Sequence, residues 1–141
     1  DKIDNMKEGE LVTSDQLKSE WTNVLSTYDL LINGGHKLRP IRFIVRHIIE
    51  KGYDRVLFPG TSMYSLLISI PADNKVNFNK TLKIEFDHLT EKLKFKYIDR
   101  TKGQTKWEET CQATEGSDLL ESFFTDNEDF RWITKDETKV E

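Results

Sequence analysis

The spacing of apolar residues changes once along this chain, from a helical period to the period of a β-strand. Between residues 13 and 52 apolar side chains recur every three or four positions, as on one face of a helix. Between residues 54 and 112 they mostly alternate with polar ones, as on a strand with one buried face. A parallel sheet would need crossovers between its strands, and helices that all precede the strands do not supply them. The chain is therefore predicted to be α+β: two N-terminal helices packed on an antiparallel meander of about five strands, with a short C-terminal helix.

Both N-terminal helices carry signals for where they begin and end. Thr13 and Gln16 have the spacing of a capping box, and residues 33–35 (Asn-Gly-Gly) suit the left-handed turn that ends a helix. Pro40 fits the first turn of the second helix, where its missing N–H is not needed, and Gly52 ends that helix. One face of each helix is apolar and is predicted to be buried. The residues on these faces are Leu17, Trp21, Val24, Leu25, Tyr28, Leu31, Ile32, Ile41, Ile44, Val45, Ile48 and Ile49.

Turn signals separate the predicted strands. Residues 55–58 and 62–70 form the first two strands, with a turn at residues 59–60 (Pro-Gly) between them. Residues 81–99 form a hairpin with strict alternation in both arms, and residues 105–112 form the last strand. The meander is therefore expected to follow the order of the chain.

The register of the hairpin can be predicted from the side chains that would face each other. We expect Phe86 to face Phe95 across the two strands. A shift by two residues would set Lys83 against Lys96, and like charges directly opposite each other are unfavourable. The hairpin is thus predicted to have a single favoured register.

The length and the cysteine content suggest one domain in a reducing compartment. With 141 residues, the chain is expected to fold as one domain over residues 13–133, between a flexible arm, residues 1–12, and a polar tail, residues 134–141. Its single cysteine, Cys111, excludes an internal disulfide framework and favours the cytoplasm. No stretch approaches the ~20 apolar residues of a membrane-spanning helix, so no membrane partner is expected.

Charge is distributed unevenly along the chain. Residues 36–107 hold 15 basic and 7 acidic residues, a net charge of +8, whereas residues 108–141 hold 3 basic and 11 acidic residues, a net charge of −8. The first 35 residues add a net charge of −4. A basic middle between acidic ends predicts either a surface for a charged partner or ends that fold back onto the centre.

Catalytic and cofactor motifs are not evident in the sequence. It has neither the phosphate-binding loop G-x-x-x-x-G-K-S/T nor the dinucleotide-binding motif G-x-G-x-x-G, so no cofactor is predicted. Its three histidines lack the spacings that preposition metal ligands, so no metal is predicted. A small enzyme with an unrecognised site would have to use Glu109, His88 and Cys111. With Cys111 facing Leu93, however, His88 and the thiol are expected two strands apart, too far for a nucleophile and its base. The sequence therefore favours a non-enzymatic function.

The leading hypothesis is an interaction protein that binds a charged protein partner through its acidic C-terminal segment. Small acidic proteins that neutralise a basic target, as bacterial toxin-immunity proteins do, resemble this chain in composition, although no motif is shared. Acidic side chains would steer the association, and aromatic ones would anchor it. The predicted contact residues are Asp126, Glu128, Asp129, Phe130 and Trp132.

An alternative site lies on the predicted second helix. Arg39, Arg42 and Arg46 fall at positions i, i+3 and i+7, on one side of that helix. Such a stripe could bind nucleic acid or a phosphate-bearing ligand, could bind an acidic protein, or could pair with the acidic C-terminal segment. Nucleic acid is the less favoured partner, because the aromatic residues sit at core positions and the sequence pI is near 5.5.

Overall fold

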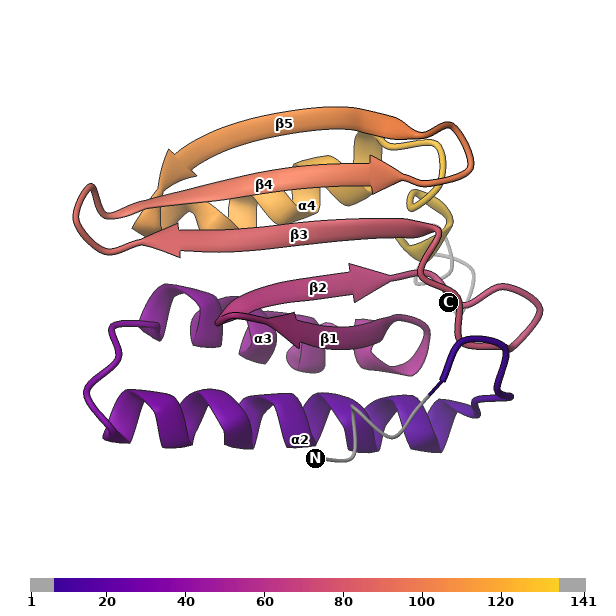
Figure 1. The fold of residues 1–141 in the computed structure, drawn as a ribbon, viewed down its shortest axis with the longest axis horizontal. Helices are drawn as coiled ribbons and strands as arrows, with labels where there is room; N and C mark the ends of the chain where they lie inside the picture. Colours follow the sequence, from indigo (N-terminus) through magenta and orange to yellow (C-terminus); the bar gives the residue numbers. More distant parts are fainter. Residues whose placement is uncertain (1–6, 135–141) are drawn as a thin grey trace.

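The computed structural model describes residues 7–134 and confirms the α+β architecture (Figure 1). Residues 1–6 and 135–141, which belong to the predicted arm and tail, lie outside the described residues. The sheet is antiparallel, and its strands lie side by side in chain order, β1-β2-β3-β4-β5. The helices are α2 (Ser14–Asn33), α3 (Arg39–Glu50) and α4 (Gly116–Asp126), with short 3-10 helices η1 (Tyr53–Arg55) and η2 (Ala113–Glu115). The strands are β1 (Phe58–Ser62), β2 (Ser65–Ser69), β3 (Lys80–Asp87), β4 (Lys92–Asp99) and β5 (Gln104–Gln112).

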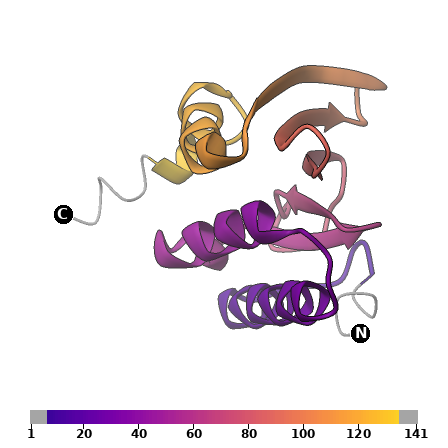
Figure 2. The ribbon, with the colours of Figure 1, turned by 90° about the vertical axis from the view of Figure 1, so that its left-hand side faces the viewer.

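The helices cover one face of the sheet and one of its edges. Helices α3 and α4 lie on the same face, and α2 runs beside α3 and β1 (Figure 2). The apolar stripes predicted for α2 and α3 face this interior, where Trp21, Ile41 and Ile48 are fully buried. Alternate residues of β3 and β4, such as Ile84 and Phe95, complete the core from the sheet side.

The predicted helix ends are confirmed. Thr13 accepts a hydrogen bond from the N–H of Gln16 at 3.1 Å, and the Gln16 side chain accepts one from the N–H of Thr13 at 2.8 Å. This reciprocal pair satisfies two N–H groups that an uncapped helix leaves open. Helix α2 ends at Asn33, before the two glycines, and Pro40 occupies the first turn of α3.

The first hairpin differs from its prediction. Residues 59–60 lie inside β1, and the turn is formed by Met63 and Tyr64, between the facing residues Ser62 and Ser65. Both turn residues have positive φ, +49° and +76°, as a two-residue turn matched to the twist of the strands requires. Pro59 is tolerated in a strand because β1 is at the edge of the sheet and has one strand neighbour. The predicted turn was wrong because Met and Tyr are not residues that usually form such turns.

The register of the β3–β4 hairpin is shifted by two residues from the prediction. Phe86 faces Leu93 rather than Phe95, and Lys83 does face Lys96. Two features account for the shift. Glu91 adopts a positive φ of +57°, which closes the loop between Asp87 and Lys92. The Lys83 amine lies 3.5 Å from the carboxylate of Glu85 on the same face, so a neighbouring acid offsets the repulsion of the facing lysines.

The pairing of β4 with β5 matches the prediction, since Leu93 faces Cys111. A bulge interrupts this pairing: Tyr97 faces Trp107 and Ile98 faces Thr105, which leaves Lys106 as an extra residue on β5. On the face of the sheet turned away from α3 and α4, the Lys94 amine lies 3.0 Å from the Glu108 carboxylate. Part of the positive charge of the middle segment is therefore balanced within the sheet.

Residues 7–12 lie against the loop that precedes β3. The N–H of Gly9 donates to the carbonyl of Val76 at 2.9 Å, and the N–H of Val12 donates to that of Asn74 at 2.8 Å. Val12 is buried with Phe58 and Val76 in a small second apolar cluster. The described part of the predicted arm is thus packed on the domain.

Candidate functional site

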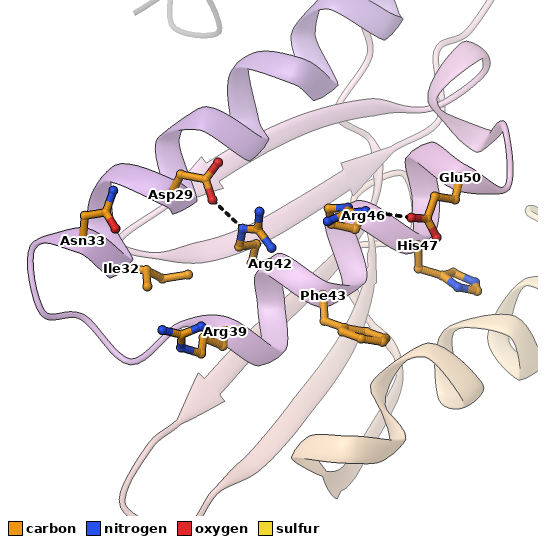
Figure 3. A pocket seen from close by; sticks show the side chains of 9 residues that line it. All are labelled: Asp29, Ile32, Asn33, Arg39, Arg42, Phe43, Arg46, His47 and Glu50. Atoms are coloured by element: carbon orange, nitrogen blue, oxygen red, sulfur yellow. Dashed lines mark hydrogen bonds and ion pairs between the residues drawn. The ribbon is translucent and has the colours of Figure 1, made fainter.

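The three arginines of α3 line a hollow between α2 and α3, which we call the arginine groove (Figure 3). Their spacing places them on one side of α3, away from the buried Ile41, Ile44 and Ile48. The hollow has a volume of about 660 Å³. Its lining residues are Asp29, Ile32, Asn33, Arg39, Arg42, Phe43, Arg46, His47 and Glu50.

The arginines differ in their partners. Arg42 donates from Nε to the carboxylate of Asp29 on α2, so this pair links the two helices across the groove. Arg46 donates to the carboxylate of Glu50, one turn further along α3, at 3.0 Å. Arg39 is exposed and has neither a hydrogen bond nor an ion pair to any of residues 7–134. Among residues 7–134, two of the three guanidiniums of the groove therefore have acidic partners and that of Arg39 has none.

Phe43 is the feature of this groove that the sequence did not reveal. Its side chain is 68% exposed and lines the same hollow as the arginines and the half-buried Ile32. Aromatic and arginine side chains are enriched where proteins bind each other, because they combine apolar area with directed hydrogen bonds. Only the helical spacing, which puts Phe43 outside the buried stripe, could have signalled its exposure.

The predicted acidic contact residues lie in different environments. Asp126 and Glu128 are exposed at the end of α4 and just beyond it. Phe130 is fully buried in the core, and its ring stacks on Phe124 with centroids 5.4 Å apart. Trp132 is half-buried and donates from its indole nitrogen to the carbonyl of Asp129 at 2.8 Å. The structure thus leaves Asp126 and Glu128 accessible and places Phe130 inside the fold.

Asp129 joins the C-terminal segment to the sheet. Its carboxylate accepts a hydrogen bond from the Tyr97 hydroxyl at 2.6 Å and one from the Lys80 amine at 3.0 Å. Burial alone would raise the pKa of Asp129, but these two hydrogen bonds outweigh burial and lower it. Burial, followed by the bond to Asp129, raises the pKa of Tyr97. Asp129 is therefore a charged group held between two donors of the fold.

The acidic segment meets α3 through a histidine rather than through the arginines. Glu121 of α4 lies 2.7 Å from Nε2 of His47 and accepts a hydrogen bond from the Tyr53 hydroxyl at 2.9 Å. Arg42 and Arg46 pair instead with acids of α2 and α3. The sequence left open that the arginine stripe pairs with the acidic C-terminal segment, and within residues 7–134 this pairing does not occur.

The residues proposed for an unrecognised enzyme do not form a site. Cys111 is half-buried, and burial, together with the nearby Glu115 and Glu109, raises the pKa of its thiol. A raised pKa disfavours the thiolate that a nucleophile needs. His88 is exposed in the β3–β4 loop, Glu109 is exposed on β5, and no hydrogen bond joins any two of these three within residues 7–134. The same residues contain no group of three or more His, Cys, Asp or Glu side chains placed to hold a metal ion.

Comparisons of the chain with protein-family models, with curated proteins and with solved structures found no match. Within residues 7–134, every helix is too short or too polar to cross a membrane. The site is therefore interpreted from its own residues.

Proposed function

We propose that this chain is a non-catalytic interaction domain that binds an acidic segment of another protein in the arginine groove. The observation that carries the proposal is that the exposed ring of Phe43 lines the same hollow as Arg39, whose guanidinium has no hydrogen bond or ion pair to any of residues 7–134. An exposed aromatic ring offers apolar contact area, and a guanidinium without a partner offers up to two parallel hydrogen bonds to a carboxylate. Together they form the kind of small, mixed patch in which a few residues supply most of the binding energy.

The charges of the groove favour a protein segment over a nucleic acid. Two acids, Asp29 and Glu50, lie among the three arginines, so the lining is only weakly positive. A nucleic-acid backbone brings a regular row of phosphates, and these acids would repel part of it. A short acidic peptide can place its carboxylates selectively, at Arg39 and beside Arg42.

A binding assay with defined probes tests the proposal. Fluorescence anisotropy would be measured with a labelled poly-glutamate peptide, and with labelled single-stranded DNA and RNA, at about 50 mM salt, where charge contacts are strongest. We expect poly-glutamate to bind. Arg39→Glu should weaken this binding about tenfold, which corresponds to ~1.4 kcal/mol.

The matched control is Arg100→Glu. Arg100 is exposed in the β4–β5 turn, outside the groove, and its substitution makes the same change in net charge. Equal loss of binding in both variants would show that only net charge matters, and would overturn the groove as the site. Binding of DNA or RNA without binding of poly-glutamate would replace the proposal with the nucleic-acid alternative.

A second candidate is an inhibitor of the bacterial toxin-immunity type that neutralises a basic protein. Its support is that Asp126 and Glu128 remain exposed next to the half-buried Trp132. Asp129 and Phe130 would contribute only indirectly, by holding this segment on the core. Labelled poly-lysine is the probe for this surface, and combining Asp126→Asn with Glu128→Gln should weaken its binding and its salt dependence. Unchanged binding in that double variant would remove this candidate.

A further inference from the structure

Exposed apolar side chains gather at one end of the molecule, which we call the loop end. It is formed by the α2–α3 loop (residues 34–38), the β1–β2 turn (residues 63–64) and the β3–β4 loop (residues 88–91), which lie together at the left of Figure 1. Met63 is 90% exposed and Leu89 is 84% exposed. A single exposed apolar side chain is common on protein surfaces, but exposed apolar side chains gathered in one place indicate a surface for binding.

The Met63–Tyr64 turn has a backbone conformation that is unfavourable for its two residue types. Both of its residues adopt positive φ, which Asn and Gly tolerate and which is unfavourable for Met and Tyr. The fully buried Tyr28 of α2 donates a hydrogen bond from its hydroxyl to the carbonyl of Tyr64 at 3.0 Å, which fixes the turn from inside. The Tyr64 ring lies against His36, with centroids 4.8 Å apart. Residues that violate a local preference while exposing apolar surface are candidates for binding.

The loop end is continuous with the arginine groove. A second hollow shares Ile32 and Arg39 with the groove and also contains His36 and Lys37. A third hollow shares His36 and Lys37 with the second and reaches Met63 and Tyr64. Arg39 and Lys37 line the path from the groove to the turn, and the acids Glu91 and Glu85 line its second and third hollows.

We infer that the partner segment extends beyond the arginine groove, across the α2–α3 loop, to the Met63–Tyr64 turn. This inference rests on the proposed function and specifies the partner further. The segment carries carboxylates that meet Arg39 and Lys37, and, at one end of this acidic stretch, apolar residues that cover Met63 and Tyr64. Charge complementarity selects the acidic part, and the exposed turn selects the apolar part.

Three labelled peptides of equal length test this inference by fluorescence anisotropy. One consists of glutamates only, and the other two replace either the first or the last two glutamates by Leu-Phe. We expect one apolar end to raise the affinity of the unmodified protein about tenfold, or ~1.4 kcal/mol. Met63→Asn should abolish this gain without reducing stability, because Asn tolerates positive φ. Arg39→Glu should weaken the binding of all three peptides.

The matched control is Leu11→Asn, which removes another exposed apolar side chain, 69% exposed and outside the three hollows. This variant should keep the full gain from the apolar end. If the all-glutamate peptide binds the unmodified protein as tightly as both others, or if Met63→Asn keeps the gain, the inference is overturned and the proposed function stands. If none of the three peptides binds, the proposed function itself fails.

Discussion

The hydrogen bond between Tyr97 and Asp129 is expected to be a major source of stability. Two substitutions break it from opposite sides: Asp129→Ala removes the acceptor, and Tyr97→Phe removes only the donor hydroxyl. Tyr97→Phe preserves the ring, which packs edge-on against Phe123 and Phe130 at centroid distances of 5.4 and 5.5 Å. The pair therefore suits a double-mutant cycle.

The size of the effect follows from the geometry. The oxygen–oxygen distance of 2.6 Å is in the range of a charge-assisted hydrogen bond, which contributes roughly 1.5–3 kcal/mol. The second bond of Asp129, to Lys80, adds only about 0–1 kcal/mol, because the Lys80 side chain is 39% exposed. Asp129→Ala should therefore lower the free energy of unfolding by about 2–4 kcal/mol, and Tyr97→Phe by about 1–2 kcal/mol.

The coupling energy is measured by urea denaturation of four proteins: the unmodified protein, the two single variants and the double variant. We expect ~1–2 kcal/mol, the cost of removing the Tyr97 hydroxyl while Asp129 is present, with similar slopes for all four proteins. A coupling energy below about 0.5 kcal/mol would refute the reasoning, because the two groups would then be acting independently. Asp129 would in that case be available for contact with a partner, as the sequence had suggested.

Four further outcomes are expected. Because the pKa of Asp129 is lowered in the folded protein, its contribution to stability is complete above the unfolded-state pKa of ~3.9. This contribution is lost as the pH falls through the lower folded-state pKa. Urea midpoints measured towards acid pH should therefore fall less steeply for Asp129→Asn than for the unmodified protein. Gly52→Ala should cost about 1 kcal/mol in urea denaturation, because Gly52 has a φ of +82° and open space around it, so that only the backbone is strained. Asp29→Asn should release Arg42, strengthen poly-glutamate binding in the anisotropy assay and change stability by less than about 1 kcal/mol. The Cys111 thiol should react with iodoacetamide at pH 8 more slowly in the folded protein than in urea, because burial raises its pKa.

The parts of the fold that could be predicted are those determined by neighbours in the chain. The capping box of Thr13 and Gln16 and the apolar stripes of α2 and α3 are local patterns, and the structure reproduces them. The β1–β2 turn could not be found in this way, because Met63 and Tyr64 both have positive φ and the carbonyl of Tyr64 is bonded to Tyr28, a residue distant in the sequence. Tertiary contacts override local turn preferences in this hairpin.

The register of β3 and β4 illustrates a related limit. The prediction weighed the facing pair Lys83 and Lys96 but not Glu85, which lies close enough to Lys83 to offset the repulsion. A cross-strand pair contributes less than about 1 kcal/mol, so a loop conformation such as that of Glu91 can outweigh it. Pair rules are therefore a weaker guide to register than the closing loop.

The candidate site was partly visible in the sequence. The arginine stripe follows from helical spacing and lies on one side of α3, as expected. The exposure of Phe43 and the binding of Asp129 by Tyr97 depend on which elements pack together, which the sequence pattern does not specify. The acidic residues of the C-terminal segment looked alike in sequence, and only the three-dimensional contacts separate the exposed Asp126 from the bonded Asp129.

The bulge at Lys106 bears on how copies of this protein behave at high concentration. Strand β5 ends the sheet, and a long, straight strand at that position would be a template for strand addition by another molecule and for amyloid-like growth. The extra residue disrupts the regular spacing of backbone donors and acceptors, and Lys106 and Glu109 place charges along the same strand. The bulge and these charges therefore disfavour edge-to-edge stacking of crowded chains on β5.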